Sequence, residues 1–198
     1  RPGERIPSIR QFQPSVEINY ITDQENLLQT RTLDSAISVQ FENNSNFRVG
    51  HTANFERLDE PFEIRDNQEI PIGDYPFNEF ELSFNGDRSR MISARTALGW
   101  GDFFDGEKNS YEFALRFQPS HQFNTEVSWE HDDVTLPSGD FTTDLATARL
   151  LYSFNTKMFI NALIQYNGTV DEIESNIRFN WIYKPLSDLF LVYNERRS

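Results

Sequence analysis

Hydrophobic and polar residues alternate strictly through residues 111–130, YEFALRFQPSHQFNTEVSWE. Every second residue of 111–117 is apolar, and the alternation resumes over 123–129 after a polar break at 119–121. Successive side chains of a β-strand point to opposite faces, so this period of two predicts two strands joined by a tight turn. One face of this hairpin is apolar and aromatic, and the other carries charges of both signs.

The same alternation recurs along the whole chain and predicts an all-β protein. Polar residues, glycines and prolines separate the alternating segments, and no segment shows the 3.6-residue period of a helix. The predicted strands are residues 15–21, 31–42, 46–56, 77–85, 90–100, 111–118, 123–130, 144–154, 157–166, 173–183 and 188–194. The two faces of the last segment cannot be told apart from its sequence.

The connections between these segments alternate in length along the chain. The short ones are residues 43–45, 86–89, 119–121, 155–156 and 184–187, and the longer ones are 22–30, 57–76, 101–110, 131–143 and 167–172. Outer-membrane β-barrels have short periplasmic turns and longer extracellular loops. The alternation therefore favours a membrane barrel whose longer connections lie outside the cell.

The charges are distributed unevenly between these connections and the rest of the chain. The longer connections, with Ile21 added to the first, hold 16 acidic and 3 basic residues, which accounts for the whole net charge of −13. We therefore expect the excess charge to lie on one rim of the sheet. A chain this acidic is not expected to bind nucleic acid, because phosphate contacts need a basic surface.

Aromatic residues are placed near both ends of the predicted strands. Two such bands, about one strand length apart with aliphatic residues between them, are typical of the two membrane interfaces. The residues expected at these interfaces are Phe41, Phe47, Trp100, Phe117, Phe123, Trp129, Tyr152, Tyr166, Trp181 and Tyr183.

A soluble β-sandwich or barrel would show the same period of two, with its apolar face turned inward. A mean hydropathy of −0.61 does not exclude a membrane barrel, because only half of each strand is then apolar. Connection length, charge and aromatic position together favour the membrane. We therefore expect an antiparallel, up-and-down transmembrane β-barrel over residues 14–198 and an irregular lead-in on the periplasmic side over residues 1–13.

The polar face of this barrel would line its lumen. Charges of both signs are interleaved on neighbouring strands, so we expect cross-strand ion pairs and, in a wide lumen, an influence on ion selectivity. The charged residues predicted to line the lumen are Glu17, Arg48, Glu56, Glu81, Arg95, Glu112, Arg116, Glu126, Arg149, Glu174 and Arg178.

No residues form a convincing catalytic or metal site. The three histidines fall on a strand, a turn and a long connection of the predicted fold. Glu79 and Glu81 share a face, but neighbours on any strand have the spacing of a glycosidase pair. Residues 102–107, DFFDGE, lack the alternating ligands of a calcium loop. We therefore expect no enzymatic activity, cofactor or metal.

Three segments resemble a known family. They are RLLYSFNTKMFINALIQYN (149–167), NIRFNWIYKPLSDLFLVYNE (176–195) and, more loosely, QPSVEINYITD (13–23). They are similar to the C-terminal β-barrel region of a family of bacterial outer-membrane proteins that carry an N-terminal, family 9 carbohydrate-binding-like domain. The resemblance implies location in the bacterial outer membrane and contact with the lipid bilayer. It also implies a preceding carbohydrate-binding-like domain or other outer-membrane subunits as partners, and it supplies no catalytic residues.

Three functions are consistent with these observations. The first is a channel or transport barrel linked to glycan or nutrient handling, and the second is a structural or anchoring barrel of a surface complex. The third is a soluble, β-rich glycan-binding module. Eleven strands would bring the first and last together in parallel, whereas bacterial single-chain barrels have even strand numbers. We therefore expect at least one further strand, as in the family, whose members continue past the VYNE segment.

Overall fold

The computed structural model describes residues 8–65 and 68–198, which form strands and turns only. Among these residues no helix is long and apolar enough to cross a membrane. The strands are β1 (Ile9–Thr22), β2 (Leu28–Phe41), β3 (Asn46–Leu58), β4 (Phe62–Arg65), β5 (Gln68–Ile70), β6 (Gly73–Asn85), β7 (Ile92–Phe103), β8 (Gly106–Phe117), β9 (Phe123–Leu136), β10 (Gly139–Asn155), β11 (Met158–Asn167), β12 (Glu172–Lys184) and β13 (Ser187–Arg197).

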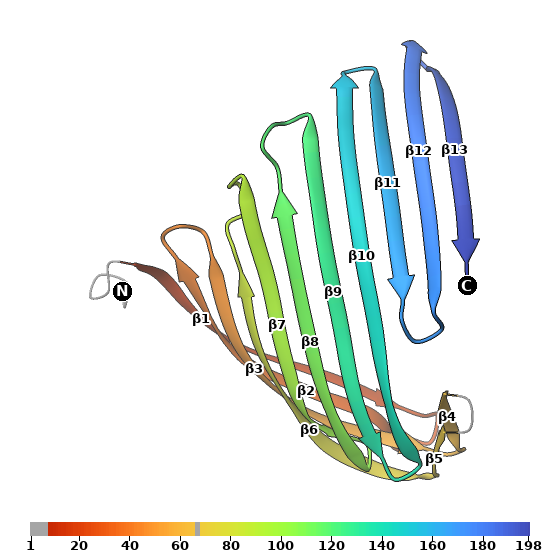
Figure 1. Cartoon of the computed structure of the whole chain (residues 1–198). Helices are drawn as coiled ribbons and strands as arrows, with labels where there is room; N and C mark the ends of the chain where they lie inside the picture. Colours follow the sequence, from red (N-terminus) through yellow and green to blue (C-terminus); the bar gives the residue numbers. More distant parts are fainter. Residues whose placement is uncertain (1–7, 66–67) are drawn as a thin grey trace. The chain divides into compact units, whose positions relative to one another are not determined.

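Eleven of these strands form one antiparallel sheet, and β4 and β5 form a separate hairpin (Figure 1). The order in the sheet is β1-β2-β3-β6-β7-β8-β9-β10-β11-β12-β13, so each strand lies beside the next one along the chain. This confirms the predicted all-β, antiparallel, up-and-down sheet of eleven strands. The described strands do not close into a barrel, because β1 and β13 stand at opposite ends of the order.

The chain forms two compact units. The first consists of residues 1–85, 97–111 and 132–142, and the second of residues 86–96, 112–131 and 143–198. The division crosses β7, β8, β9 and β10, each of which has one end in each unit. The first unit contains both the β4–β5 hairpin and the paired ends of β7 to β10 that carry many of the acidic residues.

The strand register keeps the two predicted faces separate. Directly opposite residues of antiparallel strands share a face. On one face Ile18 pairs with Leu33, and on the other Glu17 pairs with Asp34. In these pairs the sequence alternation therefore predicts correctly which residues share a face.

The register also assigns the two faces of β13. Tyr193 lies opposite Ile177 on the apolar face, whereas Val192 lies opposite Arg178 on the polar face. The segment LFLVY thus places large apolar residues on both faces, which explains why its sequence alone could not be assigned.

Two of the predicted long connections are wrong. Residues 101–110 and 131–143 are mostly strand, and only residues 104–105 and 137–138 lie between the strands. These polar strand ends are held by cross-strand contacts: Ser110 Oγ donates to Asp132 Oδ1 at 2.6 Å, and Lys108 Nζ lies 3.8 Å from the same oxygen. Tertiary pairing therefore outweighs the low strand preference of Gly, Asp and Asn here.

Because of these extensions, the predicted alternation of long and short connections is also wrong. The acidic residues at this rim lie largely on strand ends rather than in loops. In addition, β1 begins at Ile9, so part of the predicted irregular lead-in is strand; residues 1–7 lie outside the described residues. The predicted connection 57–76 contains the β4–β5 hairpin.

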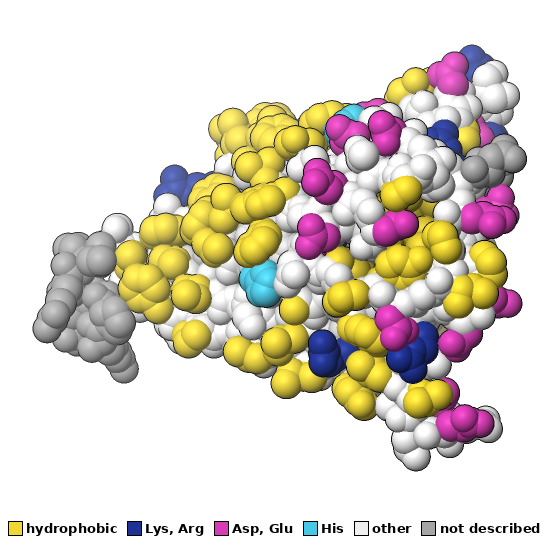
Figure 2. Space-filling view, turned by 90° about the horizontal axis from the view of Figure 1, so that it is seen from below, with side chains coloured by type: hydrophobic (Ala, Val, Ile, Leu, Met, Phe, Trp, Pro, Cys, Tyr) yellow, Lys and Arg dark blue, Asp and Glu magenta, His cyan; other side chains and the backbone are white. Residues whose placement is uncertain are grey.

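Burial is opposite to that of a soluble sheet with an apolar core. The buried hydrophobic residues among those described are few: Ala36, Ile70, Phe77, Ala114, Val134 and Leu136. Large apolar side chains remain exposed on most strands, and Figure 2 shows many of them, in yellow, on the surface of one view. Among the described residues, large apolar side chains of this face are therefore exposed on most strands.

Candidate functional site: the polar face of the sheet

Arg48 is the centre of an ion-pair network on the polar face of the first unit. Its Nη2 atom lies 2.8 Å from Asp34 Oδ1, and its Nε atom lies 3.9 Å from Glu81 Oε1. Thr52 Oγ1 also donates to Asp34, at 3.2 Å. The guanidinium lies beside Gly50, where a Cβ atom would be 3.5 Å from Arg48 Cζ. That distance is an ordinary van der Waals contact, so the guanidinium is held by the carboxylates.

The other predicted lumen residues of this unit also have partners on the polar face. Glu56 accepts a hydrogen bond of 2.8 Å from Thr30 Oγ1, and Glu17 accepts one of 3.5 Å from Asn19. The Thr30–Glu56 contact joins β2 and β3, as expected of a cross-strand network on a polar wall, whereas the Glu17–Asn19 contact lies within β1.

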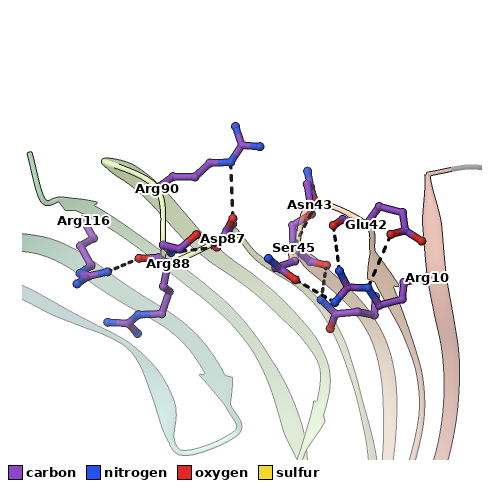
Figure 3. A network of polar contacts seen from close by, with 11 residues as sticks. Arg10, Glu42, Asn43, Ser45, Asp87, Arg88, Arg90 and Arg116 are labelled. Carbon is purple, nitrogen blue, oxygen red and sulfur yellow. Dashed lines mark hydrogen bonds and ion pairs between the residues drawn. The ribbon is translucent and has the colours of Figure 1, made fainter.

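The second unit contains two firmly held arginines. Arg95 Nη2 lies 2.7 Å from Glu112 Oε1, which is typical of a charge-assisted hydrogen bond. Arg116 donates from all three of its nitrogens: to Asn124 Oδ1 at 3.0 Å, to the carbonyl of Arg88 at 2.7 Å (Figure 3) and to Gln118. Arg116 therefore ties the turn after β6 to β8 and β9.

Three other arginines of this unit are held loosely. Arg88 Nη2 and Arg149 Nη1 lie 3.4 and 3.7 Å from the oxygens of Glu126, which are longer than optimal ion-pair contacts. Arg178 is exposed and has no hydrogen-bond or ion-pair partner among the described residues. The fold therefore leaves these three guanidinium groups without a close carboxylate partner among the described residues.

At the edge of the sheet, Glu174 on β12 lies 3.4 Å from the Nε atom of Arg196 on β13. Arg196 also contacts Glu172. The register places seven of the eleven predicted lumen residues on the polar side of their strands: Glu17, Arg48, Glu56, Glu81, Arg149, Glu174 and Arg178. The ion pair with Arg149 places Glu126 on the same side, and Arg95 and Glu112 pair with each other.

The turns at the rim opposite the acidic strand ends carry their own polar contacts. In the first unit, Arg10 donates to Asn44 Oδ1 at 2.9 Å and to the carbonyl of Glu42 at 3.2 Å (Figure 3). In the second unit, Arg90 Nε lies 3.8 Å from Asp87 Oδ2 (Figure 3). These contacts close the turns and bring no catalytic group into position.

Several predicted interface aromatics lie together on the apolar face, near the same turns. In the second unit the ring centroids of Phe117 and Phe123 are 6.1 Å apart, and those of Phe123 and Tyr152 are 6.4 Å apart. Trp181 and Tyr183 are 6.2 Å apart on β12. In the first unit, Phe47 pairs with Val39 of β2 and Phe84 of β6, and Phe41 ends β2.

Toward the acidic rim the aromatic residues are joined to polar groups. Trp100 stacks on Phe80 with centroids 5.9 Å apart in the first unit. In the second, Trp129 Nε1 donates to Asp144 at 3.3 Å, and the Tyr166 hydroxyl donates to Asp171 at 3.1 Å. An aromatic ring with a polar tip suits an interface between apolar and wet surroundings.

An aromatic cluster in the first unit was missed by the sequence reasoning. Phe104 lies at the centre, with ring centroids 5.4 Å from Tyr75, 5.4 Å from Phe77 and 6.5 Å from Phe62 of β4. Ile70 of β5 is only 1% exposed. Phe77 pairs with Asn54, so the cluster covers the polar face. The apolar residues within the acidic segment 57–76 are the feature of the sequence that could have indicated this cluster.

Arg57 and Asp74 form a bidentate pair at the acidic rim of the same unit. Arg57 Nε and Nη2 donate to the two Asp74 oxygens at 2.8 and 3.0 Å. These hydrogen bonds lower the pKa of the Asp74 carboxyl below its usual range. The pair joins the end of β3 to the start of β6.

No family model, curated protein or solved structure matches the chain. Among residues 8–65 and 68–198, no group of three or more His, Cys, Asp or Glu side chains is placed to hold a metal ion. His51 instead lies 3.1 Å from Asn78 Oδ1, and His131 Nδ1 lies 2.8 Å from Asp144. A functional assignment therefore depends on the geometry of the two faces.

Proposed function

We propose that the chain is part of a bacterial outer-membrane β-barrel whose apolar face meets lipid and whose polar face lines a lumen. Neighbouring residues carry this proposal, because their burial is inverted relative to a soluble sheet. Ser128 is 6% exposed whereas Val127 is 54% exposed, and Asn180 is 5% exposed whereas Trp181 is 42% exposed. A face of exposed valine, leucine and aromatic residues needs an apolar partner, which the bilayer supplies.

The polar face supports the same proposal. A soluble barrel fills its interior with apolar side chains, whereas membrane barrels have a polar interior. Here the interior side would carry ion pairs such as Arg48–Asp34 and Arg95–Glu112. The buried apolar side chains larger than alanine among the described residues, Ile70, Phe77, Val134 and Leu136, all belong to the acidic end of the first unit.

The function we propose for this barrel is transport, as a channel linked to glycan or nutrient handling. The link to glycans follows only from the resemblance to the family with a carbohydrate-binding-like domain, and the proposal includes no enzymatic step. A structural or anchoring barrel is the second candidate. The β4–β5 hairpin and the aromatic cluster around Phe104 favour it, because they cover part of the polar face.

Two measurements test these proposals. A refolded membrane barrel needs detergent or lipid to stay folded, and it migrates differently on a gel before and after heating. A soluble glycan-binding module stays folded in buffer alone. Conductance in planar bilayers then separates a channel from an anchoring barrel. A protein that remains folded and monomeric in buffer without detergent would contradict the membrane proposal.

A further inference from the structure

A cavity of about 440 Å³ lies on the polar face of the second unit. Its lining includes Arg88 from the turn after β6, Asn124 and Glu126 from β9, Arg149 from β10, Asn161 from β11 and Asn176 from β12. Arg149 lies opposite Leu163, which in turn lies opposite Asn176, so these residues form one row across three strands.

The charges in this cavity do not balance. Glu126 is the one carboxylate among the lining residues, and it faces both Arg88 and Arg149. Arg178, directly opposite Asn161, adds a third guanidinium next to the cavity. An excess of positive charge on a chain with a net charge of −13 is unexpected unless the charge has a use.

Most N–H donors of the two lining arginines, Arg88 and Arg149, also have no side-chain acceptor in the cavity. Each guanidinium presents five N–H donors in a fixed fork. Arg88 and Arg149 each contact only one oxygen of Glu126, at 3.4 and 3.7 Å. Their side chains are 66% and 61% exposed, whereas that of Glu126 is 19% exposed. The carboxylate is thus sheltered beneath two guanidiniums that remain open to a ligand.

The structural arginines of the same chain differ in each of these respects. Arg48 and Arg95 approach a carboxylate to 2.8 and 2.7 Å and are 28% and 40% exposed. Arg116, whose three nitrogens all donate, holds a turn. A wall built only for stability would be expected to pair Arg88 and Arg149 as closely as these.

We propose that this cavity binds an oxyanion group, a carboxylate or phosphate, carried by a small hydroxyl-rich molecule. Arg88 and Arg149 would hold the anion by charge-assisted hydrogen bonds. The amides of Asn124 and Asn161 would face the hydroxyl groups of the same molecule, and the cavity has room for a molecule the size of a monosaccharide. The site uses residues of one unit only, so it does not depend on whether the barrel spans a membrane.

Isothermal titration of the folded full chain tests this proposal, with inorganic phosphate, D-glucuronate and D-glucose as probes. Glucuronate and glucose share a ring and differ in the charged carboxylate. We expect saturable binding of phosphate and glucuronate, weakened by added salt, and no binding of glucose at the same concentrations. Equal binding of glucose and glucuronate, or no saturable binding of either anion, would overturn the proposal.

Substitutions locate the binding. Arg149→Gln should weaken glucuronate binding about tenfold, the effect of losing one charge-assisted contact. Arg90→Gln is the matched control, because it removes the same charge from the turn that carries Arg88, but Arg90 does not line the cavity and pairs with Asp87. It should change the affinity less than twofold. Equal effects of the two substitutions would show non-specific attraction and refute the site.

Glu126→Gln separates a ligand site from a structural ion pair. Removing the competing carboxylate should strengthen anion binding several-fold, whereas weaker binding would contradict the proposal. Arg88→Gln serves as the second test if Arg149→Gln fails to fold, and it should weaken binding in the same direction. A far-ultraviolet circular dichroism spectrum of the β-type for each variant verifies that it is folded, whether or not the chain spans a membrane.

Discussion

Placing an arginine at successive depths on the apolar face tests most directly which face meets lipid. On β11, Ala162 and Ile164 point to the same side, between Met158 at one end and Tyr166 at the other. Strand residues rise about 3.3 Å each, so at a tilt of about 45° Ile164 lies only about 5 Å below the level of Tyr166. Ala162 lies about 9 Å below it, nearer the middle of the aliphatic band.

The expected costs follow from these depths. An arginine at the bilayer midplane destabilises a membrane barrel by about 2–4 kcal/mol, and the cost falls to about 0–1 kcal/mol near the interfaces. Ala162→Arg should therefore cost about 3 kcal/mol, and Ile164→Arg about 1–2 kcal/mol. Ile164 is 44% exposed and faces Ala148 and Ser175 across the neighbouring strands, so little packing is lost. Gln165→Leu, on the polar face, should cost less than about 1 kcal/mol.

Reversible unfolding in denaturant, with the protein folded into lipid vesicles, measures these differences. A depth-dependent cost on the apolar face with a small cost on the polar face supports the proposed orientation. If both arginines are tolerated within about 0.5 kcal/mol, the apolar face meets water. If Gln165→Leu abolishes folding and the arginines do not, the two faces are inverted. Leu115→Arg on β8 repeats the apolar-face change and should likewise be costly.

Four further outcomes are expected. In whole cells, trypsin should cut after Arg65 on the hairpin faster than after Arg57, because Arg57 is paired with Asp74. It should spare Arg88 and Arg90, and a cut after Arg88 would reverse the proposed topology. Arg48→Met should cost about 1–2 kcal/mol in denaturant unfolding by leaving Asp34 unpaired, and Asp34→Asn in the same chain should recover part of this loss. Because the pKa of Asp74 is lowered, its carboxylate stabilises the fold above the ordinary carboxyl pKa, and this contribution is lost as the pH falls through the lowered value. Arg57→Gln removes the hydrogen bonds that lower this pKa, so NMR titration of the Asp74 carboxyl should find protonation at higher pH. The native mass of the particle extracted from membranes should exceed that of one copy of these 198 residues, because the barrel needs strands that this sheet does not supply. A sealed barrel made of one copy, with β1 paired to β13, would contradict that expectation.

The strands could be predicted because alternation reports which side of a strand is apolar. The register confirms it over whole pairs, as with Ile18 opposite Leu33 and Glu17 opposite Asp34. The ends of the strands could not be predicted in the same way. Residues such as 106–110 contain no large apolar side chain, and they are extended because Ser110 and Lys108 reach Asp132 on the neighbouring strand. That information belongs to the pairing and is absent from the local sequence.

The β4–β5 hairpin could not be predicted for a related reason. Its own strands are short, of four and three residues, and strands of this length have no readable period. They are stabilised by Phe62 against Phe104 and by the burial of Ile70. The Phe62–Phe104 contact joins segments that are distant in the chain, so the local sequence, with its acidic composition, does not show it.

The candidate site shows the same division between pattern and pairing. Alternation was enough to place Arg48, Arg149 and Arg178 among the residues of the polar face, and the register agrees. It could not indicate which of them the fold uses. Arg48 has Gly50 beside it and carboxylates at 2.8 and 3.9 Å, whereas Arg149 shares Glu126 with Arg88 at a longer distance. The difference lies in which residue each neighbouring strand presents at that register. A polar face with interleaved charges therefore contains both structural pairs and available cations, and the arginines left without a close carboxylate are the ones that can bind a ligand.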